Sequence, residues 1–127
     1  MSTAVELDAQ ALQRLRELDP AGQSGLLERV LRAFDASARR LAQQLAESRT
    51  RDDLQGIRHV AHTLKSSSAS IGALGLSRLC AEIETSIRNE APAGLGDRLD
   101  AMDRELNDVL QAVKSLLGPA DAAGNSP

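Results

Sequence analysis

Apolar residues recur at intervals of three and four positions along almost all of this 127-residue chain. The longest run of this pattern lies in the first half of the sequence and comprises Leu27, Val30, Leu31, Phe34, Ala38, Leu41 and Leu45. Because each residue advances an α-helix by about 100°, this spacing gathers the apolar side chains on one face of a helix. No stretch has the alternating pattern of a strand. The chain can therefore bury its apolar surface only by packing helix against helix.

Clusters of Pro and Gly divide the pattern into five predicted helices. We expect them at about residues 9–18, 24–48, from after Asp53 to near Gly72, 76–89 and 95–117. The four longer helices have short connections, which favours an antiparallel up-down four-helix bundle with the additional short N-terminal helix packed across one end. We expect a single bundle domain over residues 1–117. Gly118-Pro119 should end the last helix and leave residues 118–127 as a disordered tail.

The amino-acid composition restricts the binding partners and the cellular compartment that we expect for this chain. Aromatic residues make up only 1% of the chain and the formal net charge is -3, so it lacks the stacking platforms and the basic surface typical of nucleic-acid binding. The single cysteine, Cys80, lies within an apolar pattern, and we expect a buried thiol in a reducing cytosol. There is neither a membrane-length apolar run nor the basic-then-apolar layout of a signal peptide. We therefore expect a soluble, cytoplasmic protein without membrane association.

One histidine falls on the polar side of the third predicted helix. His62 lies about 130° from the centre of the apolar stripe of that helix, which comprises Leu54, Ile57, Ala61, Leu64, Ser68 and Ile71. Two cations and two very small side chains lie within two turns of it, namely Arg58, Lys65, Ser66 and Ala69. This combination favours an anion site and a docking face. Position alone also fits a plain surface histidine on a structural bundle, which is the commoner case.

An imidazole nitrogen is a competent nucleophile near neutral pH, and it could accept a phosphoryl group as a labile phosphoramidate. Lys65 could balance the incoming negative charge, while the small Ser66 and Ala69 would let the active site of another protein approach. A carboxylate that accepts a hydrogen bond from the other ring nitrogen would fix the tautomer, and Glu84 on the next helix is the candidate. By spacing alone, Glu84 is equally compatible with an ordinary solvated carboxylate.

Two consecutive segments make the pattern specific. They are His62-Thr63-Leu64-Lys65-Ser66-Ser67-Ser68-Ala69-Ser70-Ile71-Gly72 and Leu76-Ser77-Arg78-Leu79-Cys80-Ala81-Glu82-Ile83-Glu84. Together they resemble the signature of histidine-containing phosphotransfer (HPt) domains. That signature is His-x-Leu-Lys-Gly with a second glycine six residues on, followed by a helix that ends in Glu or Gln. The resemblance covers the third and fourth predicted helices closely, and the whole helix plan is similar to the bundle of that family.

The resemblance implies a role for each matching residue. His62 would be the phosphoacceptor, Lys65 would lie near the phosphoryl group, and Glu84 would orient the imidazole. Ser66 departs from the pattern, because the family usually has glycine there. We expect this change to affect which partners bind more than the ability of the protein to transfer a phosphoryl group. The expected partner-binding face comprises Arg58, His59, Lys65, Ser66, Ala69 and Gly72, of which the last matches the second glycine of the family.

The resemblance further implies a phosphorelay intermediate of two-component signal transduction. Such domains relay phosphoryl groups between aspartates of response-regulator receiver domains, and the receiver supplies the acidic pocket and Mg²⁺. We accordingly expect a monomeric phosphoryl carrier that is not itself an enzyme, binds no cofactor and works with a hybrid sensor histidine kinase. The starting Met and the short tail favour a free-standing protein over a fragment of a larger kinase.

Two other classes of function stay open at the level of sequence. A helical adaptor would use the same face to bind a receiver or a kinase without phosphotransfer. A metal- or haem-binding bundle would need more ligands than His59 and His62 provide, because the chain has no other histidine and only one cysteine. We therefore expect no metal site.

Overall fold

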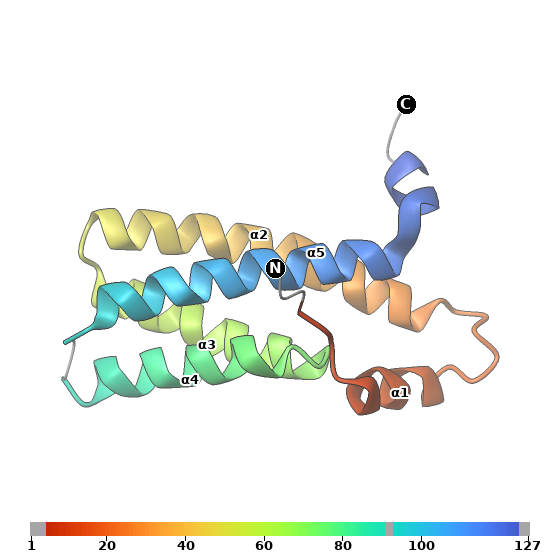
Figure 1. Ribbon diagram of the computed structural model, residues 1–127, viewed down its shortest axis with the longest axis horizontal. Coiled ribbons are helices and arrows are strands. Elements are labelled where there is room, and N and C mark those ends of the chain that lie inside the picture. Colours follow the sequence, from red (N-terminus) through yellow and green to blue (C-terminus); the bar gives the residue numbers. More distant parts are fainter. Residues whose placement is uncertain (1–4, 91–92, 125–127) are drawn as a thin grey trace.

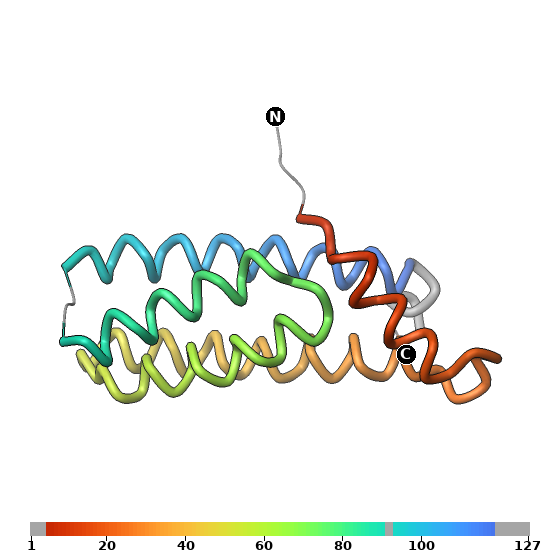
Figure 2. The backbone as a smooth tube through the Cα atoms, turned by 90° about the horizontal axis from the view of Figure 1, so that it is seen from below, coloured from red at the N-terminus to blue at the C-terminus, as the bar shows by residue number. Residues whose placement is uncertain are grey.

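The computed structural model describes residues 5–90 and 93–124, with side chains described as far as residue 118. It contains helices α1 (Ala9–Glu17), α2 (Leu26–Thr50), α3 (Leu54–Ser70), α4 (Leu74–Arg88) and α5 (Leu95–Gly124), and no strand within those ranges. Helices α2 to α5 run lengthwise in an antiparallel up-down bundle, and α1 crosses one end obliquely (Figure 1, Figure 2). The predicted all-α architecture is confirmed. None of the described helices is long and apolar enough to cross a membrane.

The core of the bundle is built from aliphatic side chains, with Phe34 as its one aromatic member. The apolar stripes of α2 to α5 supply it, as the spacing predicts. Leu54 is the exception, because it is the first residue of α3 and remains 41% exposed. Val60, which lies outside the predicted stripe, is buried instead. Since α3 packs against both α2 and α4, it buries a wider face than a single three-four stripe.

Two aspartates fix where α1 and α3 begin. Asp8 accepts a hydrogen bond from the backbone N–H of Ala11 at 3.0 Å, and Asp53 accepts one from that of Gly56 at 3.0 Å. Each carboxylate satisfies an N–H group that has no partner within the first helical turn. Asp53 thereby sets the start of the helix that carries His62.

The connection between α3 and α4 depends on Gly72. Its φ of 83° lies in the left-handed region, where glycine is favoured because it has no Cβ. Its carbonyl accepts a hydrogen bond from the N–H of Asp8 at 2.8 Å, so the N-terminal segment lies against this turn. A Cβ on Gly72 would lie 2.6 Å from the Asp8 nitrogen, closer than van der Waals contact permits. The turn therefore requires glycine both for its conformation and for space.

The C-terminal helix is interrupted at Gly118, where φ is 83° and ψ is 165°. The regular helix thus ends beside the Gly-Pro pair, as predicted, but a second helical segment follows and runs to Gly124. Pro119 suits the first turn of that segment, because a helix leaves its first N–H groups without partners. In place of the predicted disordered tail, the structure has helix as far as residue 124, and residues 125–127 lie outside the described ranges.

Cys80 lies in the core between α4 and α5. Its thiol is fully buried, and its Sγ is 3.6 Å from the Sδ of Met102. Burial raises the pKa of this thiol to about 12, so it stays protonated and unreactive near neutral pH. The expectation of a buried structural thiol is confirmed.

We predict that Gly72→Ala destabilises the protein more than Gly94→Ala does. Both glycines have a positive φ, 83° and 77°, so alanine costs about 1–2 kcal/mol of backbone energy at either position. Only at Gly72 does the new methyl group meet the Asp8 backbone, whereas the space around Gly94 is open. Overpacking of this kind costs about 1–3 kcal/mol more. Urea unfolding measures both losses, and equal losses would contradict the close contact with Asp8.

Ser68 provides a second stability test. It is fully buried in α3, and its hydroxyl has no hydrogen-bond partner in the described part of the chain. Since an unpaired buried hydroxyl costs about 1–3 kcal/mol, Ser68→Ala should raise the free energy of unfolding by about 1 kcal/mol. Ser77→Ala is the contrasting control, because the Ser77 hydroxyl donates to the Lys65 carbonyl at 2.9 Å and its removal should lower that free energy. A Ser68→Ala variant that is less stable than the wild type would contradict the interpretation that the unpaired Ser68 hydroxyl is destabilising.

Candidate functional site

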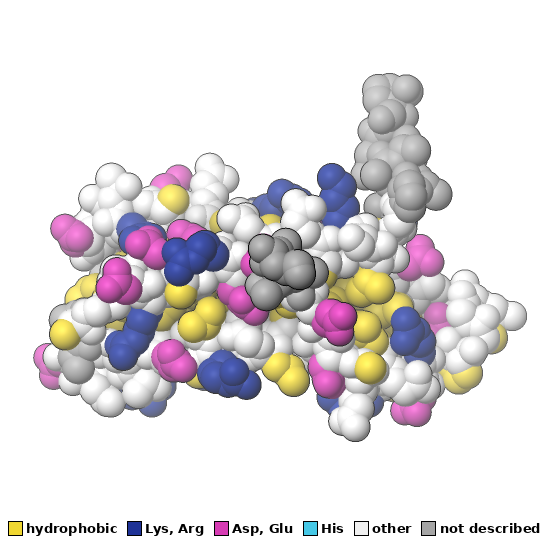
Figure 3. Space-filling model, in the orientation of Figure 1, with side chains coloured by type: hydrophobic (Ala, Val, Ile, Leu, Met, Phe, Trp, Pro, Cys, Tyr) yellow, Lys and Arg dark blue, Asp and Glu magenta, His cyan; other side chains and the backbone are white. Residues whose placement is uncertain are grey.

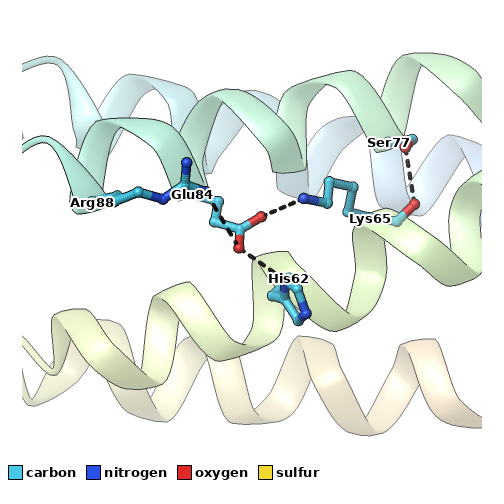
Figure 4. A network of polar contacts seen from close by, with 5 residues as sticks. All are labelled: His62, Lys65, Ser77, Glu84 and Arg88. Atoms are coloured by element: carbon cyan, nitrogen blue, oxygen red, sulfur yellow. Dashed lines mark hydrogen bonds and ion pairs between the residues drawn. The ribbon is translucent and has the colours of Figure 1, made fainter.

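His62 lies on the outer side of α3, with 64% of its side chain exposed. Its Nδ1 is 2.8 Å from Oε2 of Glu84, a residue of α4. The Glu84 side chain, by contrast, is only 4% exposed. Figure 4 shows the carboxylate reaching from α4 toward the imidazole ring. The structure thus brings together the two residues that the sequence analysis paired, one accessible and the other buried.

The Glu84 carboxylate is also held by two cations. The Lys65 ammonium donates to Oε1 at 2.7 Å, and the Arg88 guanidinium lies 3.8 Å from Oε2. The hydrogen bond from Lys65, followed by that from His62, lowers the pKa of Glu84 below its usual 4.5 and outweighs the opposing effect of burial. The carboxylate therefore stays ionised near neutral pH. Glu84 is not the ordinary solvated carboxylate that its spacing alone also allowed.

This ionised carboxylate determines which ring nitrogen of His62 carries the proton. A carboxylate only accepts hydrogen bonds, so Nδ1 must donate its N–H to Glu84. In the neutral imidazole, Nε2 then has no proton and keeps a free lone pair. In Figure 4 the second ring nitrogen points away from Glu84 and Lys65. The geometry thus leaves one nucleophilic nitrogen directed away from the ion pair.

The packing of α3 on α4 keeps this pair in register. The Ser77 hydroxyl of α4 donates to the backbone carbonyl of Lys65 on α3 at 2.9 Å. Ser68, on the buried side of α3, is small enough to let neighbouring helices approach closely. These contacts place the Glu84 side chain opposite His62 and Lys65, two residues one turn apart on α3.

Most of the remaining predicted site residues share one face of α3 with His62. At about 100° per residue, Arg58, His59, Ser66 and Ala69 all lie within roughly 60° of the direction of His62. His59, Ser66 and Ala69 are exposed, and Arg58 is half-buried. The structure therefore groups these four residues around the imidazole.

Gly72 does not belong to this face. It is buried against Asp8, and it lies ten residues after His62, or about 15 Å along the helix axis at about 1.5 Å per residue. A buried turn cannot contact a partner protein, so the partner-binding role expected for Gly72 is wrong. Its function is to allow the tight connection into α4.

Two residues near His62, Gln55 and Arg88, are not among those predicted from the sequence. A shallow pocket of about 240 Å³ beside the ring is lined by Gln55, Arg58, His59, His62 and Glu84. Gln55 lies two turns before His62 on the same helical face, a spacing that could have indicated it. Arg88 lies one turn after Glu84, but its approach to the carboxylate depends on Glu84 facing α3, which no local pattern reveals.

The fold and the site together define a helical bundle that presents one oriented imidazole at its surface. In the described ranges, no group of three or more His, Cys, Asp or Glu side chains could hold a metal ion. The site consists instead of a nucleophilic ring, a buried carboxylate that orients it, and flanking cations.

The family model of the Hpt domain matches residues 29–115, more than half of the chain, and the chain therefore belongs to the Hpt domain family. Its fold is similar to that of histidine-containing phosphotransfer protein B (HptB) from Pseudomonas aeruginosa PAO1. The TM-score is 0.78 at 26% sequence identity, and the match covers 91% of this chain and 96% of that one. A comparison with curated proteins found no match.

Family membership and the structural similarity support histidine phosphotransfer in phosphorelay signalling as the function of this chain in broad terms. Hpt domain proteins are phosphocarriers that interact with response-regulator receiver domains and with kinases. The resemblance stated from the sequence is thereby confirmed at the level of the family.

The lowered pKa of Glu84 predicts a pH-dependent contribution to stability. The ionised carboxylate contributes stability above its usual pKa of 4.5, and this contribution is lost as the pH falls through the lowered value. We expect Glu84→Gln to lower the free energy of unfolding by about 2 kcal/mol at neutral pH. The difference from the wild type should shrink as the pH falls below 4.5. Urea unfolding at neutral and at acidic pH measures both effects.

Glu82→Gln is the matched control, because Glu82 is exposed on the same helix. It should change stability by less than about 0.5 kcal/mol at neutral pH. A loss in Glu84→Gln that stays constant down to the lowest pH would contradict the ionised pair.

Proposed function

We propose that His62 is the phosphoacceptor of a phosphorelay intermediate. It receives a phosphoryl group from a phospho-aspartate of one receiver domain and passes it to another response regulator. The hydrogen bond of 2.8 Å between His62 Nδ1 and Glu84 carries this proposal. It fixes the tautomer in which Nε2 has a free lone pair, and the 64% exposure of the side chain makes the ring accessible. An adaptor that only docks would need no oriented imidazole.

The transfer step is an in-line displacement at phosphorus. The Nε2 lone pair forms the N–P bond while the P–O bond to the aspartate breaks, and the aspartate leaves as a carboxylate. The ring gains positive charge as the bond forms, and the ionised Glu84 stabilises that charge through the Nδ1–H group. No proton leaves Nδ1. Transfer to the second aspartate is therefore the reverse of the same step.

Lys65 supports this step through Glu84. Its ammonium lies on Oε1 at 2.7 Å, where it keeps the carboxylate ionised and in place beside the ring. Because the same carboxylate accepts from His62, Lys65 contributes to the orientation of the imidazole without touching it. The contact between Lys65 and the phosphoryl group that the resemblance implies stays a prediction.

The rest of the chemistry belongs to the partner. We propose that this chain is a monomeric cytoplasmic phosphoryl carrier rather than an enzyme, that it binds no cofactor, and that the receiver supplies the acidic pocket and Mg²⁺. Its partners are receiver domains and a hybrid sensor histidine kinase, and not nucleic acid or membranes. The small exposed side chains of Ser66 and Ala69 let a receiver approach the ring. Docking of this kind buries a modest area, on the order of 1,200 Å² or less.

Transfer of radioactive phosphate from a phosphorylated receiver domain tests the assignment. The wild type should become labelled, and His62→Gln should be labelled at least about 100-fold less, because the amide has no nucleophilic nitrogen. His59→Gln is the matched control, since it removes the neighbouring exposed histidine, and it should still be labelled on His62. Full labelling of His62→Gln would overturn the proposal. An unlabelled wild type that nevertheless binds receivers would support the adaptor.

Ala69 tests the docking surface separately from the chemistry. Ala69→Arg should slow transfer from a receiver about tenfold or more, because a long charged side chain blocks close approach two turns from His62. Its phosphorylation by phosphoramidate, a small donor that needs no docking, should stay within about twofold of wild type. Asn107→Arg adds the same charge at an exposed position of α5 and serves as the control. Equal slowing with both donors would show that Ala69→Arg damages the site itself.

A further inference from the structure

Lys65 is bound to α4 at two points. Its backbone carbonyl accepts a hydrogen bond from the Ser77 hydroxyl at 2.9 Å, and its ammonium donates to Glu84 Oε1 at 2.7 Å. On α4, Glu84 follows Ser77 by about two turns, or roughly 10 Å along the helix axis. Figure 4 shows the Lys65 side chain extending from the Ser77 contact toward the carboxylate. One residue of α3 thus spans two turns of α4.

The direction of these two side chains makes the contact sensitive to a slide of one helix along the other. In an α-helix, side chains lean toward the N-terminus of their own helix. Because α3 and α4 are antiparallel, Lys65 leans away from the turn that joins them, and Glu84 leans toward it (Figure 2). A slide of α3 toward the turn would therefore draw the ammonium away from the carboxylate. The same slide would displace His62 from Oε2, which its Nδ1 contacts at 2.8 Å.

A hydroxyl that donates to a backbone carbonyl fixes two helices more closely than an ion pair at the surface does. The Arg49 guanidinium joins α2 to α5, at 3.1 Å from Asp100. Figure 3 shows other acidic and basic side chains close together on the face that α5 crosses. Long side chains can change rotamer and follow a small shift of a helix. The Ser77 side chain is short and its acceptor is backbone, so the O–H···O range of about 2.5–3.0 Å leaves little room for a slide.

We propose that Ser77 is a positioning residue of the phosphotransfer site, which acts on His62 through Lys65 and Glu84 without touching the ring. Its hydroxyl holds the Lys65 backbone at the level from which the ammonium reaches Oε1. The carboxylate held in this way keeps Oε2 on the Nδ1–H group and leaves the lone pair on Nε2. The effect of Ser77 on transfer rests on the assignment of His62 as phosphoacceptor, whereas its effect on the ring proton does not.

The turn between α3 and α4 offers the competing explanation for this register. There the Ala73 N–H donates to the Ser68 carbonyl at 2.8 Å, which joins the end of α3 to the start of α4. Ser77 lies about one turn from the start of α4, and Glu84 lies two turns further on. A small change of helix direction at the turn grows with distance along the helices. The Ser77 contact restrains such a change before it reaches the ion pair.

Nitrogen-15 nuclear magnetic resonance of the imidazole rings in the whole protein tests the effect on the ring proton. Spectra are recorded in mildly alkaline solution, where an ordinary imidazole is neutral. The wild type should carry the His62 proton on Nδ1. In Ser77→Ala, about a tenth or more of the molecules should carry it on Nε2, because the carboxylate is held less firmly beside Nδ1. The signals of His59, an exposed histidine one turn earlier, should not change and serve as the internal reference.

Phosphorylation by phosphoramidate, which needs no partner protein, tests the effect on reactivity. Ser77→Ala should lower the rate about threefold, the scale of one neutral hydrogen bond. Ser77→Thr keeps the hydroxyl and should recover most of the lost rate. Ser70→Ala is the matched control, because the Ser70 hydroxyl also donates to a backbone carbonyl, that of Ser66 at 3.0 Å, but within α3. It should change neither the ring proton nor the rate, and circular dichroism establishes that each variant is folded.

The outcomes separate this proposal from the one on which it rests. A Ser77→Ala variant with its His62 proton on Nδ1 would overturn the proposal, because the turn alone would then set the register. A Ser77→Thr variant as impaired as Ser77→Ala would also overturn it, because the effect would come from side-chain shape and not from the hydroxyl. A wild type that carries the proton on Nδ1 but is not phosphorylated on His62 would remove the phosphoacceptor assignment and leave the effect of Ser77 on the ring proton intact.

Discussion

The site depends on one buried carboxylate that binds two side chains at once. Burying an ionised Glu84 at 4% exposure would be costly without close positive charge, and Lys65 supplies that charge at 2.7 Å. The second carboxylate oxygen is then available for the imidazole at 2.8 Å. The reactive nitrogen of His62 is thus selected by an interaction on the opposite edge of the ring. Because Glu84 is on α4 whereas His62 and Lys65 are on α3, the geometry of this site depends on how these two helices pack.

The periodic pattern of apolar residues was sufficient to predict the helices, their order and most of the core. The pattern mispredicted burial at positions where exposure depends on the place of a residue within its helix and on how many helices pack against it. Leu54 fits the stripe of α3 but is its first residue and remains 41% exposed. Val60 lies outside the stripe but is buried, because α3 has neighbours on two sides. The helical segment after Gly118 was also missed, since a Gly-Pro pair ends one helix and can equally begin another.

The residues of α3 around His62 could be predicted, because spacing within one helix determines which side chains share a face. The role of Glu84 could not be decided from spacing, since its orientation depends on the register between two helices. The partner-binding role predicted for Gly72 was wrong for a related reason. Its motif position suggests proximity to His62, but the N-terminal segment folds back and Asp8 covers it. Contacts between residues far apart in sequence are invisible to any local pattern.

The difference in exposure between the ring and its carboxylate has an evolutionary consequence. The side chains of Ser66 and Ala69 lie at the surface and take no part in the ion pair behind the ring. Under the proposed function, substitutions at these two positions would change which receiver is recognised and would preserve the reactivity of the imidazole. The buried half of the arrangement has no such freedom, because a change at Glu84 or Lys65 alters the nucleophile for every partner. Signalling pathways can therefore diverge through substitutions at these exposed positions, while the buried ion pair stays the same.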